Sequence, residues 1–238
     1  MQAEGEKSDK ISKISTGIPR VDELLYGGFD GRDNIVVSGN NFSQKRSFIY
    51  NFIKSSANSG MKVIIINVDG SSESLLADLA RRGTDLENII LLDGFSKNFQ
   101  EKVPPNAEVI DDPSNVSSVL KQYMLRAQKE KDFIFVFLSA TPYLMDFNDQ
   151  NRKFFVQLVH WNRKNSLLST YVLDDFVGQT TAEWFAYMMD FSLYFKNDGD
   201  YDYMRVLSLK PVRTKDWIRI YKDSDVFTLG SFNVERIR

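Results

Sequence analysis

The strongest constraint on the fold is a set of short apolar runs, rich in β-branched residues, that alternate along the chain with amphipathic stretches. These runs are continuously apolar, and they lie at Asn34–Ser38, Val63–Val68, Ile89–Leu92, Phe133–Leu138 and Ser169–Leu173. Strands with apolar side chains on both faces are typical of a parallel sheet that helices cover on either side. We therefore predict an α/β fold with a central, mainly parallel sheet between two helical layers.

The amphipathic stretches between these runs predict the helices. They cover Ser47–Ser59, Ser72–Arg82, Pro113–Lys129, Asn148–Lys164 and Thr181–Met189. Asp112 and Pro113 are expected to cap and open the third of these helices, and Thr180 and Glu183 have the spacing of a capping box.

The C-terminal end has a different pattern, in which strands alternate with turns. The predicted strands are Phe191–Phe195, Tyr203–Leu209, Trp217–Tyr221 and Val226–Phe227, and Asn197–Asp200 is a turn sequence of the hairpin kind. The polar residues 1–12 are expected to form a flexible arm, because they offer almost nothing to bury. Residues 13–238 are then one domain, with a β-rich C-terminal end.

Composition excludes several classes of function. Thirty Lys and Arg against 32 Asp and Glu give a formal charge of −2 over 238 residues, which leaves room for a local basic patch but not for a global basic field. The absence of cysteine excludes disulfides, thiol catalysis and cysteine metal sites, and a single histidine, His160, argues against a histidine triad. No apolar run reaches the roughly 18 residues of a membrane span and no signal peptide opens the chain, so we expect a soluble, cytoplasmic protein.

The first buried run leads into a loop that partly matches a phosphate-binding pattern. The loop consists of Gly39, Asn40, Asn41, Phe42, Ser43, Gln44, Lys45, Arg46 and Ser47. The P-loop pattern G-x-x-x-x-G-K-[ST] has Gly39 and Lys45 at the right spacing, whereas Gln44 and Arg46 replace the second glycine and the hydroxyl residue. This loop is the candidate nucleotide site.

Further segments resemble one known family. Ser15–Phe29 reads STGIPRVDELLYGGF and closely resembles the segment that precedes the P-loop in KaiC-like members of the RecA superfamily. Ile66–Ser71 resembles the end of the second strand of that family, and Phe135–Ser139 resembles its Walker B strand. The resemblance covers most of residues 14–230 and implies a RecA-like, three-layer P-loop NTPase fold of archaeal type.

Several positions depart from the chemistry that this family needs. Arg46 stands where a Ser or Thr hydroxyl binds Mg²⁺, and Leu138 replaces the Walker B aspartate. A guanidinium has no lone pair for a metal ion, and an alkyl side chain has no ligand atom. Asp69-Gly70 stands in place of a paired catalytic carboxylate, so one shorter acid remains. Both metal positions have therefore changed together.

The surviving polar residues have alternative interpretations. Lys45 is either a residual phosphate contact, together with Gly39 and Arg46, or a solvated lysine of a collapsed loop. Lys210 and Arg213 resemble residues that reach a neighbouring subunit's nucleotide in ring-forming relatives, but their spacing is one residue too long, which favours a solvated pair. Four acidic residues are expected near strand ends, and they are Asp69, Asp93, Asp174 and Asp175. They either bind a replacement metal or form turns. We favour turns, with no metal site.

The resemblance and the losses together predict a catalytically inactive relative that acts by binding, as a regulatory or structural subunit. No catalytic residue and no cofactor are expected, and any ATP is expected to bind weakly and without Mg²⁺. We expect a homo-oligomer or a complex with a related ATPase, through aromatic-rich surfaces and through Ile18–Leu25. The aromatic residues Trp184, Phe185 and Tyr187 are expected first to belong to the core and only second to anchor an interface. The alternatives are a sensor that binds ATP without hydrolysing it, a DNA-repair accessory protein similar to recombinase paralogues, which the charge disfavours, and, least favoured, an active ATPase.

Overall fold

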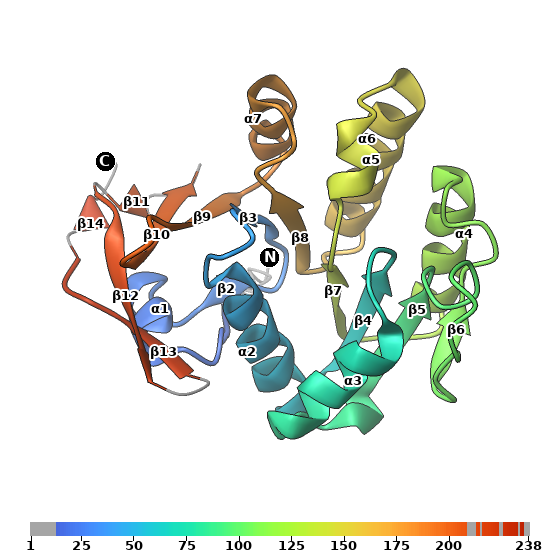
Figure 1. Ribbon diagram of the computed structural model, residues 1–238, viewed down its shortest axis with the longest axis horizontal. Helices are drawn as coiled ribbons and strands as arrows, with labels where there is room; N and C mark the ends of the chain where they lie inside the picture. The colour runs from blue at the N-terminus through green and yellow to red at the C-terminus, as the bar shows by residue number, and fades with distance from the viewer. Residues whose placement is uncertain (1–12, 209–212, 215, 224–225, 233, 236–238) are drawn as a thin grey trace, which may run out of the picture.

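The main sheet of the protein has ten strands, in the order β13-β12-β10-β9-β3-β8-β7-β4-β5-β6 (Figure 1). The computed structural model describes residues 13–208, 213–214, 216–223, 226–232 and 234–235, so the expected arm at residues 1–12 lies outside the described residues. The parallel strands are β3 (Asn34–Gly39), β4 (Lys62–Asn67), β5 (Ile89–Asp93), β6 (Ala107–Val109), β7 (Phe133–Phe137), β8 (Ser169–Asp174) and β9 (Phe191–Asn197). Antiparallel strands extend the sheet beyond β9, and they are β10 (Asp202–Ser208), β12 (Ile218–Asp223) and β13 (Val226–Leu229).

Helices form a layer on each side of the parallel strands, as the continuously apolar runs predict (Figure 1). One layer contains α1 (Pro19–Leu24), α2 (Lys45–Asn58) and α3 (Ser72–Arg81), and a 3₁₀ turn, η1 (Leu86–Asn88), precedes β5. The other layer contains α4 (Val116–Ala127), α5 (Thr141–Met145), α6 (Asp149–Lys164) and α7 (Gln179–Tyr187). The predicted three-layer α/β fold with a β-rich C-terminal end is confirmed.

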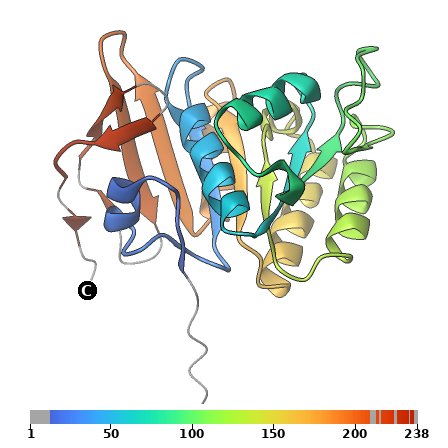
Figure 2. The same cartoon turned by 90° about the horizontal axis from the view of Figure 1, so that it is seen from below.

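Two short two-stranded sheets lie beside the main sheet. One pairs β1 (Lys13–Ile14) with β2 (Phe29–Asp30), and the other pairs β11 (Arg213–Thr214) with β14 (Val234–Glu235). Figure 2 shows the antiparallel strands, orange to red, gathered at one end of the molecule, while the green and yellow helices lie toward the other end.

Two predicted helix starts are wrong. Helix α4 begins at Val116 and its cap is Asn115, whose side chain accepts a hydrogen bond from the backbone N–H of Ser117 at 3.0 Å. Pro113 lies outside this helix, and its carbonyl accepts a hydrogen bond from the hydroxyl of Tyr143. Helix α7 begins after Gly178 with no side-chain cap, so the capping box predicted from Thr180 does not form.

The segment that precedes the loop is tied down within the chain. Asp22 accepts hydrogen bonds from the backbone N–H and the hydroxyl of Thr16, both at 2.7 Å. The apolar side chains of Ile18, Val21 and Leu24 are fully buried in the core beneath α2. Ile18–Leu25 therefore stabilises its own domain and does not present an apolar surface to a partner, contrary to our expectation.

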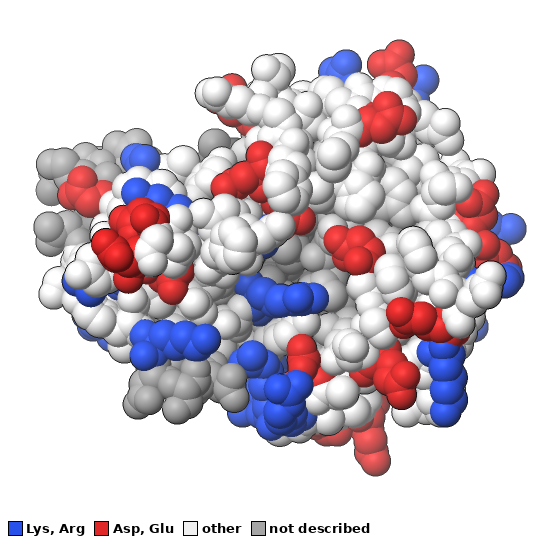
Figure 3. Space-filling model, in the orientation of Figure 1, with Lys and Arg blue, Asp and Glu red and all other residues white. Residues whose placement is uncertain are grey.

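The surface shows both signs of charge and one hollow. Figure 3 shows acidic and basic side chains interspersed on the face that is viewed in Figure 1, with basic side chains at the edge of a hollow near the middle. In the part of the chain that the structure describes, no helix is long and apolar enough to cross a membrane.

Candidate functional site

The loop after β3 lies at the carboxyl ends of the parallel strands, where open α/β sheets bind ligands. Gly39 opens the loop with φ +155°, and a Cβ atom there would stand 2.1 Å from the carbonyl oxygen of Phe195. The loop then closes on itself, because the backbone N–H and the hydroxyl of Ser43 both donate to the carbonyl of Asn40, at 3.1 and 2.7 Å. Because a Cβ atom at Gly39 would collide with the backbone of β9, the packing of β3 against β9 requires the first glycine of the motif.

Gln44 occupies the position of the missing second glycine and has a different role. Its φ of −78° is open to any residue, so no glycine is needed for the backbone to enter α2. Its side-chain amide donates to Asp202 Oδ2 at 2.8 Å, and Asp202 Oδ1 accepts a second hydrogen bond from Asn197 at 3.0 Å. The Gln44 side chain thus ties the loop to the β9–β10 hairpin.

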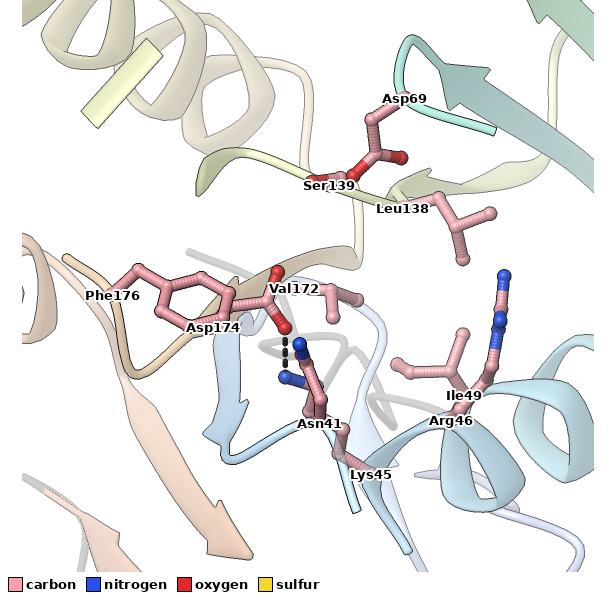
Figure 4. Close-up of a pocket in the computed structure, with 10 residues that line it drawn as sticks. All are labelled: Asn41, Lys45, Arg46, Ile49, Asp69, Leu138, Ser139, Val172, Asp174 and Phe176. Carbon is pink, nitrogen blue, oxygen red and sulfur yellow. Dashed lines mark hydrogen bonds and ion pairs between the residues drawn. The ribbon is translucent and has the colours of Figure 1, made fainter. Parts of the chain in front are cut away.

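Lys45 is buried, with 6% of its surface exposed, and its ammonium group is fully occupied within the chain. The ammonium donates to the carbonyl of Gly39 at 2.5 Å and to the carbonyl of Leu173 at 3.2 Å, and it forms an ion pair with Asp174 (Figure 4). An ammonium has three donors, and these three acceptors use them all. The interpretation of Lys45 as a solvated loop lysine is wrong.

Asp174 ends β8, the strand between β3 and β7, and is held from two sides. Besides the ion pair with Lys45, its Oδ2 accepts from the hydroxyl of Thr141 at 3.2 Å, and its backbone N–H donates to that hydroxyl oxygen at 2.8 Å. Its sequence position marked it only as a polar strand end. The pairing with Lys45 was missed, because no motif links residues 129 positions apart.

The two altered metal positions border the same pocket. Arg46 is exposed, and its guanidinium lies 5.7 Å from the ring centre of Tyr50, which also has Arg82 at 5.3 Å. Burial raises the pKa of the Tyr50 hydroxyl, while Arg46 acts in the opposite direction. Across the pocket, Leu138 is half-buried against the core. Neither a guanidinium nor an alkyl side chain can ligate a metal ion, so both positions lack a metal ligand.

The pocket has a volume of about 430 Å³ and opens beside the loop (Figure 4). It is lined by Asn41, Lys45, Arg46, Ile49, Asp69, Leu138, Ser139, Val172, Asp174 and Phe176. The hydroxyl of Ser139 is buried and has no hydrogen-bond partner among the described residues. Next to Asp174 in the chain, partial desolvation raises the pKa of the Asp175 carboxyl, while Lys45 acts in the opposite direction.

The structure brings some of the predicted acidic residues to the site and keeps others away. Asp69 is exposed and lines the pocket from the end of β4. Asp93 is buried at the end of β5 and accepts hydrogen bonds from the backbone N–H groups of Phe95 and Ser96 at 2.9 and 3.0 Å, as a turn residue does. Within the described ranges, no three Asp, Glu or His side chains gather as a metal site would require.

The remaining candidates lie elsewhere or outside the described residues. Ser47 is the third residue of α2 and is not among the residues lining the pocket, whereas Phe42 projects from the loop with 84% of its surface exposed. Lys210 lies outside the described residues, and Arg213 is described only as part of strand β11. In the predicted aromatic run, Phe185 is buried in the core and Tyr187 is 81% exposed.

Comparisons with known proteins agree with this architecture. Over 116 residues the chain is 22% identical to the UPF0273 protein of Aeropyrum pernix, a match that covers 46% of this chain and 47% of that protein. The chain thus matches about half the length of this curated relative. The crystal structure of a KaiC-like protein from Pyrococcus horikoshii OT3 has a TM-score of 0.70 at 14% identity, covering 93% of this chain and 100% of that one, which shows a shared fold. Residues 14–193 match the family model described as the KaiC ATPase, and because this is most of the chain, the protein belongs to the KaiC family.

Proposed function

We propose that this KaiC-family domain acts by binding, as a regulatory or structural subunit, and does not hydrolyse ATP. The observation that carries the proposal is the ion pair between Lys45 and Asp174. A phosphate would have to displace a carboxylate that is already paired with a buried ammonium and held by Thr141. The lysine that serves phosphate in the family motif is thus satisfied inside the chain.

The residues at the metal positions support the same conclusion. Phosphoryl transfer in P-loop enzymes depends on Mg²⁺, which a Ser or Thr hydroxyl and a Walker B carboxylate hold. Arg46 and Leu138 occupy these positions and do not fit Mg²⁺, because neither has an oxygen to offer. Asp69 is the acidic residue left at the catalytic pair, and Gly70 follows it.

A subunit of this kind needs a partner, which we propose to be a second copy of the chain or a related ATPase. The exposed aromatic side chains of Phe42 and Phe176 support an interface near the carboxyl ends of the strands, because large exposed apolar side chains often mark contact surfaces, and Tyr187 is a further exposed aromatic residue at the end of α7. Light scattering over a range of concentrations tests this. A monomer at all concentrations that also copurifies with no partner contradicts it.

Phosphate release by purified protein tests the absence of hydrolysis. The expected result is that the unmodified chain releases no more phosphate from Mg·ATP than the Lys45→Met variant. A steady release that Lys45→Met abolishes contradicts the proposal, because a contaminating ATPase would remain in both preparations.

The second candidate is a sensor that binds ATP without hydrolysing it. The pocket favours it, because about 430 Å³ is open beside the loop and the exposed guanidinium of Arg46 lines it. A guanidinium binds phosphate oxygens in the absence of a metal. The sensor is supported if ATP changes the oligomeric state equally with Mg²⁺ and with a chelator, and is rejected if ATP leaves it unchanged.

A further inference from the structure

The antiparallel end of the sheet buries its core apolar side chains on one face. The core beneath α1 and α2 takes its buried side chains from every strand at this end, including Phe195, Met204, Ile220 and Phe227. The core on the other side of the sheet contains no described residue of β9, β10, β12 or β13. That second face is therefore not covered by the helical layer that covers the parallel strands (Figure 2).

Aromatic and cationic side chains occupy the open face. Side chains alternate between the two faces of a strand, so the residues next to the buried ones point away from the core. Eight residues on or beside the strands define what we call the aromatic–cationic face: Tyr194, Lys196, Tyr201, Tyr203, Arg205, Trp217, Arg219 and Tyr221. Five are aromatic and three are cationic.

Strand register mixes the two kinds of side chain into a checkerboard. Tyr203 pairs with Lys196 on one side and with Arg219 on the other, and Arg205 pairs with Tyr194. Each aromatic ring of these rows therefore has a cation in the next strand. Among the rings, Trp217 is 38% exposed and Tyr221 is 50% exposed, so solvent reaches them.

The cations hold the rings in place. Lys196 Nζ lies 4.5 Å from the ring centre of Trp217 and 5.0 Å from that of Tyr203. The guanidinium of Arg219 lies 3.5 Å from the ring centre of Tyr201 and 5.1 Å from that of Tyr221. Such cation–π contacts fix side-chain rotamers and so lower the entropy cost of ordering a ligand on the rings.

Two acidic residues of the β9–β10 hairpin differ in where their side chains point, and the carboxylate of Asp198 forms a hydrogen bond with the hydroxyl of Tyr203 at the edge of this face. Asp202 points to the opposite face, where Gln44 and Asn197 hold its carboxylate. Asp198 and Asp200 lie in the turn that joins β9 to β10. The charged residues among the eight that define the face are Lys196, Arg205 and Arg219, and they form a local basic cluster of the kind that a total charge of −2 had left open.

We propose that the aromatic–cationic face binds single-stranded nucleic acid. Every base has a π-face that stacks on an exposed aromatic ring, and lysine and arginine contact the phosphates between successive bases. A duplex does not fit this chemistry, because its bases are already stacked on one another. None of the eight residues of the face lines the nucleotide pocket.

Fluorescence anisotropy with labelled oligothymidylate and oligouridylate of one length tests the proposal. Both strands are expected to bind saturably and more tightly than a duplex of that length, and the stronger of the two distinguishes DNA from RNA. Three phosphate contacts predict that the logarithm of the association constant falls with the logarithm of salt concentration with a slope of about −2. Bound bases are also expected to quench the fluorescence of Trp217.

Two variants of the face and two matched controls make the test specific. Tyr221→Ala and Lys196→Ala are each expected to weaken binding about tenfold, because each removes one stacking or phosphate contact. Phe99→Ala and Lys153→Ala change an exposed aromatic and an exposed basic residue outside the face, and are expected to leave binding unchanged. Far-UV circular dichroism and thermal melting establish that each variant is folded.

Two results overturn the proposal. One is the absence of saturable binding of either single strand at low salt, or binding that both face variants leave unchanged. The other is a self-associated protein that binds no oligonucleotide and that Tyr221→Ala or Lys196→Ala converts to monomer, because the face would then be an interface between copies of the chain.

Discussion

The ammonium of Lys45 forms an ion pair with the carboxylate of Asp174 at the end of β8, in the loop where the family motif places phosphate. Lys45 is 6% exposed, and the pair is bordered by the hydroxyl of Thr141 and by backbone carbonyls. The carboxylate of Asp174 thus supplies, from within the chain, the negative charge that a phosphate ligand would bring to Lys45. The loss of ligand at Lys45 therefore accompanies the loss of metal ligands at Arg46 and Leu138.

Asp174→Asn is expected to open the anion site and to destabilise the fold. Removing one partner of a buried ion pair leaves the charge of the other uncompensated. Because Asp174 is partly exposed, we expect the free energy of unfolding to fall by about 1–3 kcal/mol, less than for a fully buried pair. Millimolar sulfate is expected to restore part of this loss by binding Lys45. Urea unfolding with sulfate, against chloride of equal ionic strength, measures it, with Asp175→Asn as the control. An equal response to sulfate in both variants and the unmodified chain contradicts the assignment.

A double-mutant cycle of Lys45→Met and Asp174→Leu is expected to show strong coupling. Each single change strands a charge, whereas the double change removes both charges. The double variant should therefore be more stable than the sum of the single effects, by about 1–3 kcal/mol. Chemical denaturation of the four proteins measures this coupling. Additive effects would mean that the two groups do not interact in solution.

Metal-dependent binding should return when the altered positions are rebuilt. Gln44→Gly, Arg46→Thr and Leu138→Asp together supply the loop backbone and two oxygen ligands, and we expect weak binding of Mg·ATP. Adding Asp174→Thr frees Lys45 and should strengthen binding further, but efficient turnover is not expected because Gly70 still lacks a carboxylate. Calorimetric titration of both variants tests this. Equal affinities with and without Asp174→Thr would mean that Asp174 does not hinder phosphate binding at Lys45.

Alkaline stability should depend on three buried tyrosines. Burial raises the pKa of Tyr123, Tyr143 and Tyr171 above 10.0, their ordinary value. Between pH 10 and the higher folded-state pKa, these tyrosines ionise in the unfolded chain but not in the folded one. Stability is therefore fully present below pH 10 and falls as pH rises, by about 1.4 kcal/mol per pH unit for each such group.

Urea unfolding from pH 9 to pH 11 measures this slope. Tyr171→Phe is the matched variant, and it should reduce the slope by one group. It is also expected to lower stability at every pH, because the amide of Asn162 loses the hydroxyl that it contacts at 3.0 Å. A slope that Tyr171→Phe leaves unchanged would mean that this hydroxyl already ionises normally in the folded chain.

The layers of the fold could be predicted from the sequence because burial on both faces leaves a direct pattern. Phe133–Leu138 is apolar throughout and Ser169–Leu173 is buried along its length, and they became the adjacent central strands β7 and β8. Helix ends were harder to predict. Asp112 and Asn115 are both good capping residues, and the local pattern alone does not distinguish them, whereas in the structure Asn115 caps the helix and Pro113 contacts Tyr143.

The site could be predicted as a set of positions but not as a set of contacts. The motif located Lys45 and Arg46, and the strand pattern located Leu138, since these depend on local spacing. The partner of Lys45 depends on which strand lies beside β3, and hence on the sheet order. The same reason explains the aromatic–cationic face, because Lys196 and Arg219 meet the same tyrosine only through the pairing of three strands.

Titration of the unmodified chain with ATP, once with Mg²⁺ and once with a chelator, tests the loss of ATPase chemistry most directly. A ligand that binds the folded state stabilises it by RT ln(1 + [L]/Kd), so a hundredfold excess over Kd adds about 2.7 kcal/mol and raises the melting temperature visibly. With Lys45 held by Asp174 and no oxygen at Arg46 or Leu138, we predict a negligible shift with Mg·ATP, no larger than the shift with ATP and chelator. A large shift that requires Mg²⁺ would contradict the account.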